Sequence, residues 1–513
     1  MRRSIATVVV ALSAALAISM LPSTSTAAGG SDGGSSIAPV GAVEAHRALE
    51  VAKAVLADKH STSVSKADPT LALRDLRLAL PSLGAADRRA ANDLLARPTS
   101  SHDRYGDSYS VPAKRKCNAR FCIHWVSRTA DAPPSHRWVL RMLHLMTRVY
   151  KKEVGKLNYR KPISDGHRGG NGKFDVYLKN LYPKGYYGYC APERPTSYNG
   201  YLYSGYCVLD NNFARREYGA PPMASASVTA AHEFFHAIQF AYDTGEDRWM
   251  MESTATWMEE RFNDKSNDNR QYLGSGQLRF PNLPLDYYNP NGFSQYANWL
   301  YFEYLSEHYG NGVVHKIWTK AAARSRRHNP FSTHAIASVL SHHHGFRKVF
   351  AKYAAGNTMP ARTYSEGKHY RSAPYAVSRK LGKAHKSSGV HRFSVQHLAS
   401  LNARYRPAKA LRAKAWHVRI TINGPGRAKS PAVYVVVHRR HKPLARKLVH
   451  LSRHGNGKVA FEFSHRQVKY LTVTMANTST RFHRCGSGTV YSCQGVPNAP
   501  RTGFKVKAVA FRK

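Results

Sequence analysis

Acidic residues are scarce in this chain. Its 513 residues include 31 aspartates and glutamates against 77 lysines and arginines, which gives a formal net charge of +46. After Glu366 only one acidic residue remains, Glu462. Such a basic surface favours polyanions, whether cell-wall polymers, anionic membranes, nucleic acid or acidic proteins. A basic surface kept for solubility is the alternative.

Several motifs of common enzyme classes are also absent. The sequence has no G-x-S-x-G elbow, no P-loop and no Rossmann glycine pattern. These absences argue against an α/β-hydrolase, a P-loop NTPase and a dinucleotide-binding protein. Beyond the N-terminal region no apolar run is long enough to span a bilayer. With 42% hydrophobic residues, the chain can still bury a large core.

The N-terminal stretch has the features of a secretory signal peptide. Arg2 and Arg3 precede an apolar run, and small residues follow as far as Ala28, where we predict cleavage. A membrane anchor is the alternative, but the apolar run is short for that role. We therefore expect a secreted, extracellular protein, which its basic surface could hold at the cell wall.

The six cysteines fall into three close pairs: Cys117 with Cys122, Cys190 with Cys207, and Cys485 with Cys493. An even number of cysteines after a signal peptide predicts local disulfides in an oxidising compartment. The sequence alone does not fix their connectivity, and zinc–cysteine sites are the alternative.

The main candidate for chemistry is HEFFH, His232 to His236, within SVTAAHEFFHAIQFAY. Residues four apart share one face of a helix, so the two imidazoles can face one metal ion with Glu233 beside them. Apolar residues recur at helical spacing through the same segment, which predicts a partly buried helix. An ordinary core helix with two hydrogen-bonded histidines is the alternative.

The third metal ligand is expected in the following segment, WMMESTATWMEE. A catalytic zinc site commonly has three protein ligands and leaves the fourth position to water. Fifteen residues separate Glu252 from His236, a gap that suits a turn and a second helix returning alongside the first. The small residues after Glu252 would let the two helices approach closely. Glu259 and Glu260, about two turns further on, are the competing ligands.

The chemistry expected of this site is peptide hydrolysis by zinc-activated water. Zinc lowers the pKa of water toward ~7 and polarises the scissile carbonyl. Glu233 is placed to take the proton from the water and deliver it to the leaving amine. Tyr296 is a candidate donor to the oxyanion, with an ordinary helix tyrosine as the alternative.

The periodicity of the chain predicts an α+β fold, with a zincin-like metallopeptidase domain, mostly α beyond the HEFFH helix, and a C-terminal all-β sandwich. The expected segments are a signal peptide at 1–28, a linker and helical pro-like segment at 29–110, the metallopeptidase domain at 111–386, and a basic β-sandwich module at 387–513. Helices in the pro-like segment are expected at about 43–58, 69–80 and 86–97. This segment is either a removed propeptide or a retained helical extension. Because it contains no cysteine, any inhibition by it would have to be steric.

Oxygen atoms of Asp165, Asn171 and Asp175 could bind a calcium ion. Their spacing does not match an EF-hand loop. Stabilisation of a turn is therefore the alternative that we favour.

Taken together, the motifs resemble a known group of peptidases. HEFFHAIQ followed by WMMESTATWMEE is similar to the HExxH and WLxEGxAxYxE pair of gluzincins. With GKFDVYLKNLY and YYGYCAPE, the region 171–357 resembles secreted bacterial zinc metalloproteases of the myxobacterial type. The resemblance implies His232, His236 and Glu252 as zinc ligands and Glu233 as the general base. It also favours Tyr296, because a tyrosine on a later helix assists the oxyanion in the aminopeptidase-like pattern.

The sequence departs from that pattern in two places. Ser253 replaces the glycine that follows the third ligand, and the GxMEN element of exopeptidases is absent. We therefore expect an endopeptidase that acts on proteins or peptides. We expect no specific binding of nucleic acid. The sequence gives no prediction of the oligomeric state. The alternative function is a non-catalytic protein that binds polyanions or the cell wall and carries a vestigial protease site.

Overall fold

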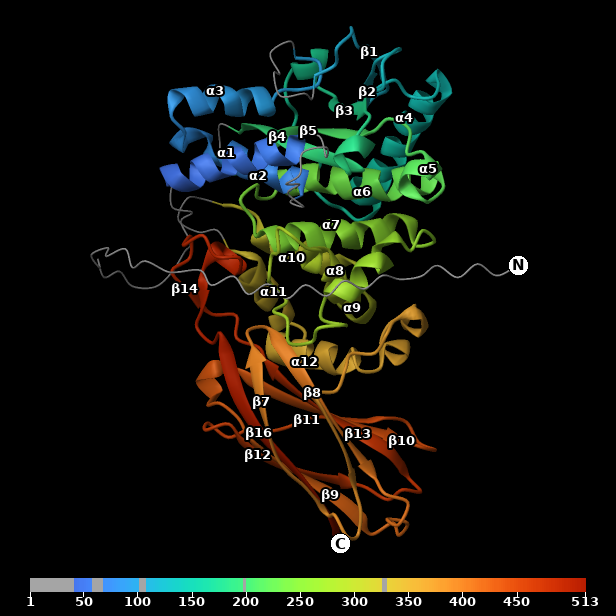
Figure 1. The fold of residues 1–513 in the computed structure, drawn as a ribbon, viewed down its shortest axis with the longest axis vertical. Helices are drawn as coiled ribbons and strands as arrows, with labels where there is room; N and C mark the ends of the chain where they lie inside the picture. The colour runs from blue at the N-terminus through green and yellow to red at the C-terminus, as the bar shows by residue number, and fades with distance from the viewer. Residues whose placement is uncertain (1–40, 58–67, 101–107, 197–199, 325–329) are drawn as a thin grey trace, which may run out of the picture. The chain divides into compact units, whose positions relative to one another are not determined.

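The computed structural model describes residues 41–57, 68–100, 108–196, 200–324 and 330–513. The predicted signal peptide at 1–28 lies outside these ranges. Among the described residues, no helix combines the length and the apolar character that crossing a membrane requires. Helices and mostly antiparallel sheets together confirm the predicted α+β class (Figure 1).

A five-stranded mixed sheet, in the order β1-β2-β3-β5-β4, organises the first half of the chain. Its strands are β1 (Lys114–Cys117), β2 (Phe121–Trp125), β3 (Phe174–Lys179), β4 (Gly188–Pro195) and β5 (Tyr203–Asp210). The central strands β2, β3 and β5 are parallel, whereas β1 and β4 are antiparallel to their neighbours. Strand β4 is therefore an edge strand, with backbone groups left for other partners.

Helices cover both faces of this sheet. Successive strand residues point to opposite faces, and Val176 belongs to the large core cluster with α4 (His136–Tyr150) and α6 (Pro222–Phe240). Its neighbour Tyr177 belongs to a second cluster with the N-terminal helices. Those helices are α1 (Ala42–Leu56), α2 (Pro69–Ala79) and α3 (Ala85–Leu94). All three were expected from the sequence, and they form a layer on the sheet.

A mostly helical region follows α6, as predicted. Its helices are α7 (Arg248–Asn263), α8 (Ser294–Ala297), α9 (Trp299–Tyr309), α10 (Gly312–Ala321), α11 (Ser332–Ser341) and α12 (Phe346–Gly356). A short helix, α5 (Arg215–Tyr218), precedes α6, and a π-helical turn at Lys151–Lys156 extends α4. Gly310, with φ 85°, ends α9, because a left-handed backbone is easiest for glycine.

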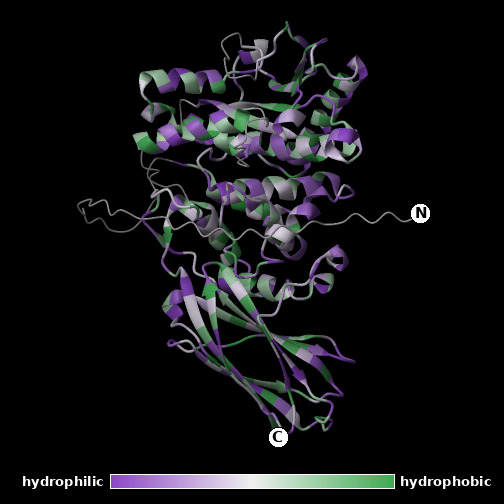
Figure 2. Ribbon diagram, in the orientation of Figure 1, coloured by the Kyte–Doolittle hydropathy of each residue, from purple (hydrophilic) through white to green (hydrophobic). Residues whose placement is uncertain are grey.

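The C-terminal region is built from β-sheets, as the alternating pattern predicted (Figure 2). One sheet has the order β11-β10-β13-β8-β6 and the other β12-β9-β16-β7. The strands are β6 (Val377–Leu381), β7 (Ser387–Gln396), β8 (Ala399–Pro407), β9 (Trp416–Asn423), β10 (Pro431–Arg439), β11 (Ala445–Leu448), β12 (Asn456–Glu462), β13 (Val468–Asn477) and β16 (Arg501–Arg512), with a small pair of β14 (Phe482–His483) and β15 (Val496–Pro497). Apolar residues of both large sheets form one core cluster. Strand β6 precedes the predicted boundary at 387 and pairs with β8.

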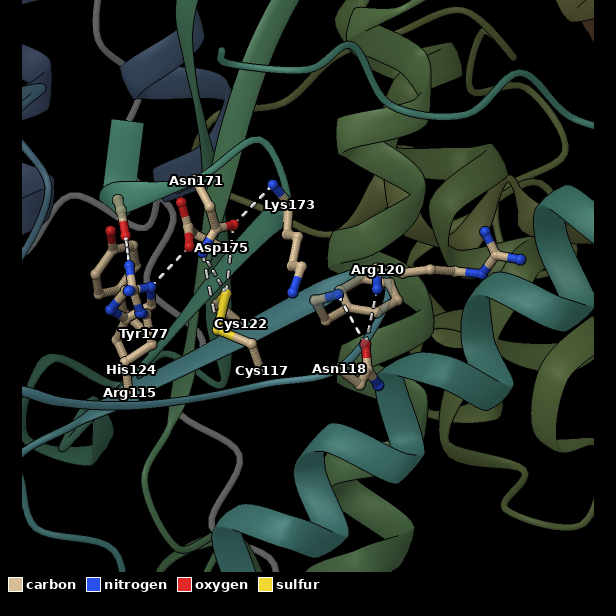
Figure 3. The surroundings of a disulfide bond; sticks show 12 residues. Arg115, Cys117, Asn118, Arg120, Cys122, His124, Asn171, Lys173, Asp175 and Tyr177 are labelled. Carbon is tan, nitrogen blue, oxygen red and sulfur yellow. Dashed lines mark hydrogen bonds and ion pairs between the residues drawn. A yellow bond between two sulfur atoms is a disulfide. The ribbon is translucent and has the colours of Figure 1, made fainter. Parts of the chain in front are cut away.

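All six cysteines form disulfides in the three predicted pairs. Cys117–Cys122 joins β1 to β2, Cys190–Cys207 joins β4 to β5, and Cys485–Cys493 closes a loop near β14. Figure 3 shows the first pair, with Asn171 beside its sulfur atoms. The disulfides therefore replace the alternative of zinc–cysteine sites.

Candidate metal centre

Helices α6 and α7 bring three of the predicted site residues together. His232 and His236 lie one turn apart on α6, and Glu252 lies on α7, which packs against α6. One ligand atom from each of the three lies within 4.8 Å of the others. All three side chains are buried. Next to Glu252, the Ser253 hydroxyl lies within hydrogen-bonding distance of the Trp249 carbonyl in α7 and the Gln295 carbonyl in α8.

The distances within this cluster fit a zinc ion. His232 Nε2 lies 3.4 Å from Glu252 Oε2, and His236 Nε2 lies 3.5 Å from Glu252 Oε1. A tetrahedral ion with bonds of 2.0–2.1 Å separates its ligand atoms by about 3.3 Å. His236 Nε2 and both Glu252 oxygens are buried and have no hydrogen-bond partner among the described residues. Unpartnered buried polar atoms are costly, so the donor set suits a bound cation.

The other imidazole nitrogens are held by side chains behind the cluster. His232 Nδ1 lies 2.7 Å from Glu259 Oε1, and His236 Nδ1 lies 2.7 Å from Gln239 Oε1. The Gln239 amide is fixed in turn, because it donates to the Met251 carbonyl at 2.9 Å. Such contacts fix the tautomer and orientation of ligating imidazoles. Glu259, considered as a ligand from the sequence, therefore lies behind His232.

The pKa values of the two histidines shift in opposite directions. Burial lowers the pKa of His236 to about 4, although the Glu252 charge opposes it. Burial also disfavours the charged form of His232, but the nearby carboxylates of Glu252 and Glu259 outweigh it and raise that pKa. The neutral imidazole that a metal requires is thus the favoured form of His236.

Glu233 and Tyr296 border the cluster, and each contacts the N-terminal layer. Glu233 Oε2 accepts a hydrogen bond of 3.1 Å from the Thr70 hydroxyl. Burial raises the pKa of Glu233 to about 8, while the charge of His232 opposes the shift. The Tyr296 ring stacks 6.1 Å from the His232 ring, and its hydroxyl donates to Asp68 Oδ2 at 2.7 Å.

Asp68 and Thr70 are site neighbours that sequence reasoning missed. The sequence Asp68-Pro69 is readable only as a helix start, with aspartate at the N-cap and proline at the first helical position. Asp68 does cap α2, because Oδ1 accepts from the Leu71 amide at 2.9 Å. Nothing in the sequence indicates that this turn lies beside the HEFFH helix.

The oxygen atoms considered for calcium have other partners. Asp165 and Asp175 both form ion pairs with Arg97. Asn171 Oδ1 accepts from the Lys173 amide at 2.9 Å, within a turn (Figure 3). These contacts agree with the turn-stabilising alternative, so we propose no calcium ion there.

The comparisons with known proteins cover only the middle of the chain. No curated protein matches the sequence. A family model matches residues 219–361, a region that includes helices α6, α7 and α8. Every predicted site residue from His232 to Tyr296 lies within it. It leaves out the N-terminal layer and the C-terminal sheets. Over residues 219–361 the chain is similar to the family described as "Family of unknown function (DUF6055)".

Proposed function

We propose that this protein is a secreted zinc-dependent metalloendopeptidase of the gluzincin type. One observation carries the proposal: beside the His232 ring, His236 Nε2 and both Glu252 oxygens are buried without a hydrogen-bond partner among the described residues, while the Nδ1 atoms of both imidazoles are held from behind. A core helix with two satisfied histidines would leave neither His236 Nε2 nor the Glu252 carboxylate unpaired. Zinc is the metal that two histidines and a glutamate commonly hold in hydrolases.

Each side chain around the centre has a distinct role in this proposal. Zinc, when bound, supplies an activated water and polarises the peptide carbonyl. Glu233 accepts the water proton and passes it to the leaving nitrogen, a task favoured by a pKa near neutrality. Tyr296 donates its hydroxyl proton in a hydrogen bond to the oxyanion. Glu259 and Gln239 keep both imidazole rings aligned.

The edge strand β4 supports action on extended polypeptides. A peptide can add to a free sheet edge through main-chain hydrogen bonds, and β4 runs beside the catalytic glutamate. A Cβ atom at Gly188 would lie 3.0 Å from the Glu233 side chain, so glycine keeps this approach open. An extended chain along β4 would lie next to Glu233, which suits cleavage within a chain.

The proposed test is Glu233→Gln, which preserves size and removes the base. We expect zinc to remain near one ion per chain while chelator-sensitive hydrolysis of casein falls by roughly 10³-fold or more. Glu366→Gln, a glutamate outside the centre, serves as the matched control and should retain activity. Full activity in Glu233→Gln would contradict the mechanism.

Export is part of the same proposal. The three disulfides suit an oxidising compartment, and the predicted signal peptide would direct the chain there. N-terminal sequencing of secreted protein tests this, because it reports both cleavage near Ala28 and any later removal of the N-terminal helices.

A second candidate function is polyanion or cell-wall binding with a vestigial protease site. It is favoured by the outer face of the β12-β9-β16-β7 sheet, where Lys505 and Lys507 are exposed and alternate with buried residues of β16. The register sets Lys505 beside Arg392, and Thr421 lies between Lys507 and Lys458. Residues paired across strands share a face, so positive charge is concentrated there.

The effect of salt on retention by isolated cell walls tests whether the basic face binds polyanions. Lys505→Glu with Lys507→Glu should weaken retention on isolated cell walls and reduce its dependence on salt. Metal analysis then separates the two functions, since a vestigial site would hold no stoichiometric zinc. The two functions can also coexist in one protein, with the basic face holding the enzyme at its substrate.

A further inference from the structure

The first turn of α2 engages both catalytic groups that are not metal ligands. Asp68 Oδ2 accepts the Tyr296 hydroxyl proton at 2.7 Å, and the Thr70 hydroxyl donates to Glu233 Oε2 at 3.1 Å. We infer that helices α1, α2 and α3 form a built-in inhibitor of the metal centre, with Asp68 and Thr70 as its latch. The inference rests on the proposed peptidase function and names its regulation.

The latch occupies the groups that catalysis needs. A Tyr296 hydroxyl that donates to Asp68 has no proton to offer an oxyanion. Glu233 accepts from Thr70 on Oε2, so one of its two carboxylate oxygens is engaged. Asp68 is fixed in this position because its other oxygen caps α2 through the Leu71 amide. The contact is therefore more specific than the steric cover that the sequence suggested.

The same helix also covers the substrate edge of the sheet. The Thr70 hydroxyl accepts from the Cys190 amide at 3.0 Å, and Arg77 Nε donates to the Pro192 carbonyl at 2.9 Å. Both backbone groups belong to the edge strand β4. A peptide adding to this edge would need such groups, so catalysis and binding are blocked by one element.

Hydrogen bonds and ion pairs hold the segment in place. Arg74, 2% exposed, donates to the Glu246 carbonyl at 2.6 Å, in the turn before α7. Its neighbour Asp75 pairs with Arg248 at 2.8 Å. At the far end Arg97 forms ion pairs with three carboxylates, those of Asp165, Asp175 and Glu193. An inhibitor acting within one chain needs this kind of stable docking.

The apolar contacts between helices α1 to α3 and the sheet indicate how much of this layer must move to uncover the site. Helices α1 to α3 share a buried cluster with the sheet residues Tyr177, Tyr206 and Val208. Removing the whole segment would expose this face, whereas displacing only the first turn of α2 would free Glu233, Tyr296 and the Cys190 amide. Access to the centre therefore requires movement of that turn at least.

The experiment uses the full chain with Asp68→Ala and, separately, Thr70→Val. The second variant leaves the helix cap intact, so it tests the latch even where loss of the cap impairs folding. Ser135→Ala is the matched control, because Ser135 caps α4 through the Trp138 amide away from the centre. Two rates are measured: hydrolysis of a quenched peptide, and extraction of bound zinc by a chelator.

We expect each latch variant to raise both rates by about tenfold or more over wild type, and Ser135→Ala to change neither. The double variant Asp68→Ala/Glu233→Gln should release zinc rapidly without hydrolysis, which separates the latch from catalysis. If the wild type hydrolyses the peptide and both latch variants show the same two rates as the wild type, the proposed latch is overturned. The proposed peptidase function would then still stand. Absence of zinc and of hydrolysis from every variant would overturn the peptidase function itself.

Discussion

Two groups of potential metal ligands involve helix α7, and their surroundings differ. The first is His232, His236 and Glu252, which we call the histidine cluster. The second is Glu260, Asp264 and Glu366, which we call the carboxylate cluster. All members of the histidine cluster are buried, whereas Asp264 is exposed and Glu366 is half-buried.

The two clusters also differ in the hydrogen-bond and ion-pair partners of their side chains. In the carboxylate cluster Glu260 accepts from the Asn269 amide at 2.7 Å, and Glu366 pairs with Arg270 at 2.5 Å. Two of its three carboxylates thus already have protein partners. The histidine cluster has no such partners for His236 Nε2 and the Glu252 oxygens among the described residues. Proximity of ligand types is common, but only the histidine cluster combines it with buried ligand atoms that lack partners among the described residues, which favours it as the metal site.

The largest expected effect is loss of the metal from the histidine cluster. Glu252→Gln, which keeps the side-chain shape, should weaken zinc binding at least about 100-fold, because it replaces a charged ligand with a neutral amide. Zinc content after dialysis, measured by mass spectrometry, reports this loss. Glu366→Gln should retain one zinc ion per chain. Equal losses in both variants would remove the distinction between the clusters.

A smaller effect is expected from the residue behind His232. Glu259→Ala should weaken zinc affinity by about 10- to 100-fold, since the imidazole loses the acceptor that fixes its Nδ1 proton. Competition with a chelator of known affinity measures the change. The adjacent Glu260→Ala is the control and should leave zinc affinity unchanged, because Glu260 faces Asn269 instead. A loss of affinity in the control would contradict this assignment.

We expect Glu260 of the carboxylate cluster to make the free energy of unfolding depend on pH. Burial and a hydrogen bond with Asp264 raise the pKa of Glu260 to about 8, against 4.5 for an ordinary glutamate. A raised pKa means that the folded state favours the protonated form, so stability is lost as pH rises from about 4.5 to 8.

Glu260→Gln cannot ionise and should flatten this part of the pH dependence. Allowing for solvent screening, we expect the free energy of unfolding of the variant to gain about 1–2 kcal/mol relative to wild type between pH 5 and pH 8. Urea unfolding at the two pH values measures the difference. Parallel pH profiles in the two proteins would show that Glu260 ionises normally.

The smallest effect is expected from the ion pair at the edge of the carboxylate cluster. Glu366→Gln removes the pairing with Arg270, in which both side chains are partly exposed. Such pairs contribute about 1 kcal/mol or less, so unfolding should shift little at low salt and still less at high salt. Thermal unfolding at two salt concentrations measures this. A shift of several kcal/mol would indicate that the cluster stabilises the fold more than its exposure suggests.

Local patterns in the sequence predicted most of the elements. Helical periodicity located α1, α2 and α3 to within a few residues, and alternation predicted that the C-terminal region consists of β-sheets. Individual strands of that region, such as β7 and β8, were not predicted. Their residues are fixed by pairing with β16 and β13, which lie far along the chain.

For the candidate site, sequence spacing was enough to select His232, His236 and Glu252, because helical geometry relates residues one turn apart. It also offered Glu259 and Glu260 as alternatives to Glu252. Only the packing of α7 against α6 separated these three glutamates: Glu252 faces both imidazoles, Glu259 lies behind one, and Glu260 faces away.

By itself, then, the sequence determined the basic charge and the helical and alternating segments, and it suggested the three cysteine pairs and the residues that we propose to bind zinc. These properties depend on composition or on neighbours within a few turns. The contacts of Asp68 with Tyr296 and of Thr70 with Glu233 join residues 228 and 163 positions apart. Only the tertiary structure decided them, because they depend on how α2, α6 and α8 pack around one sheet edge, and no local spacing encodes that arrangement.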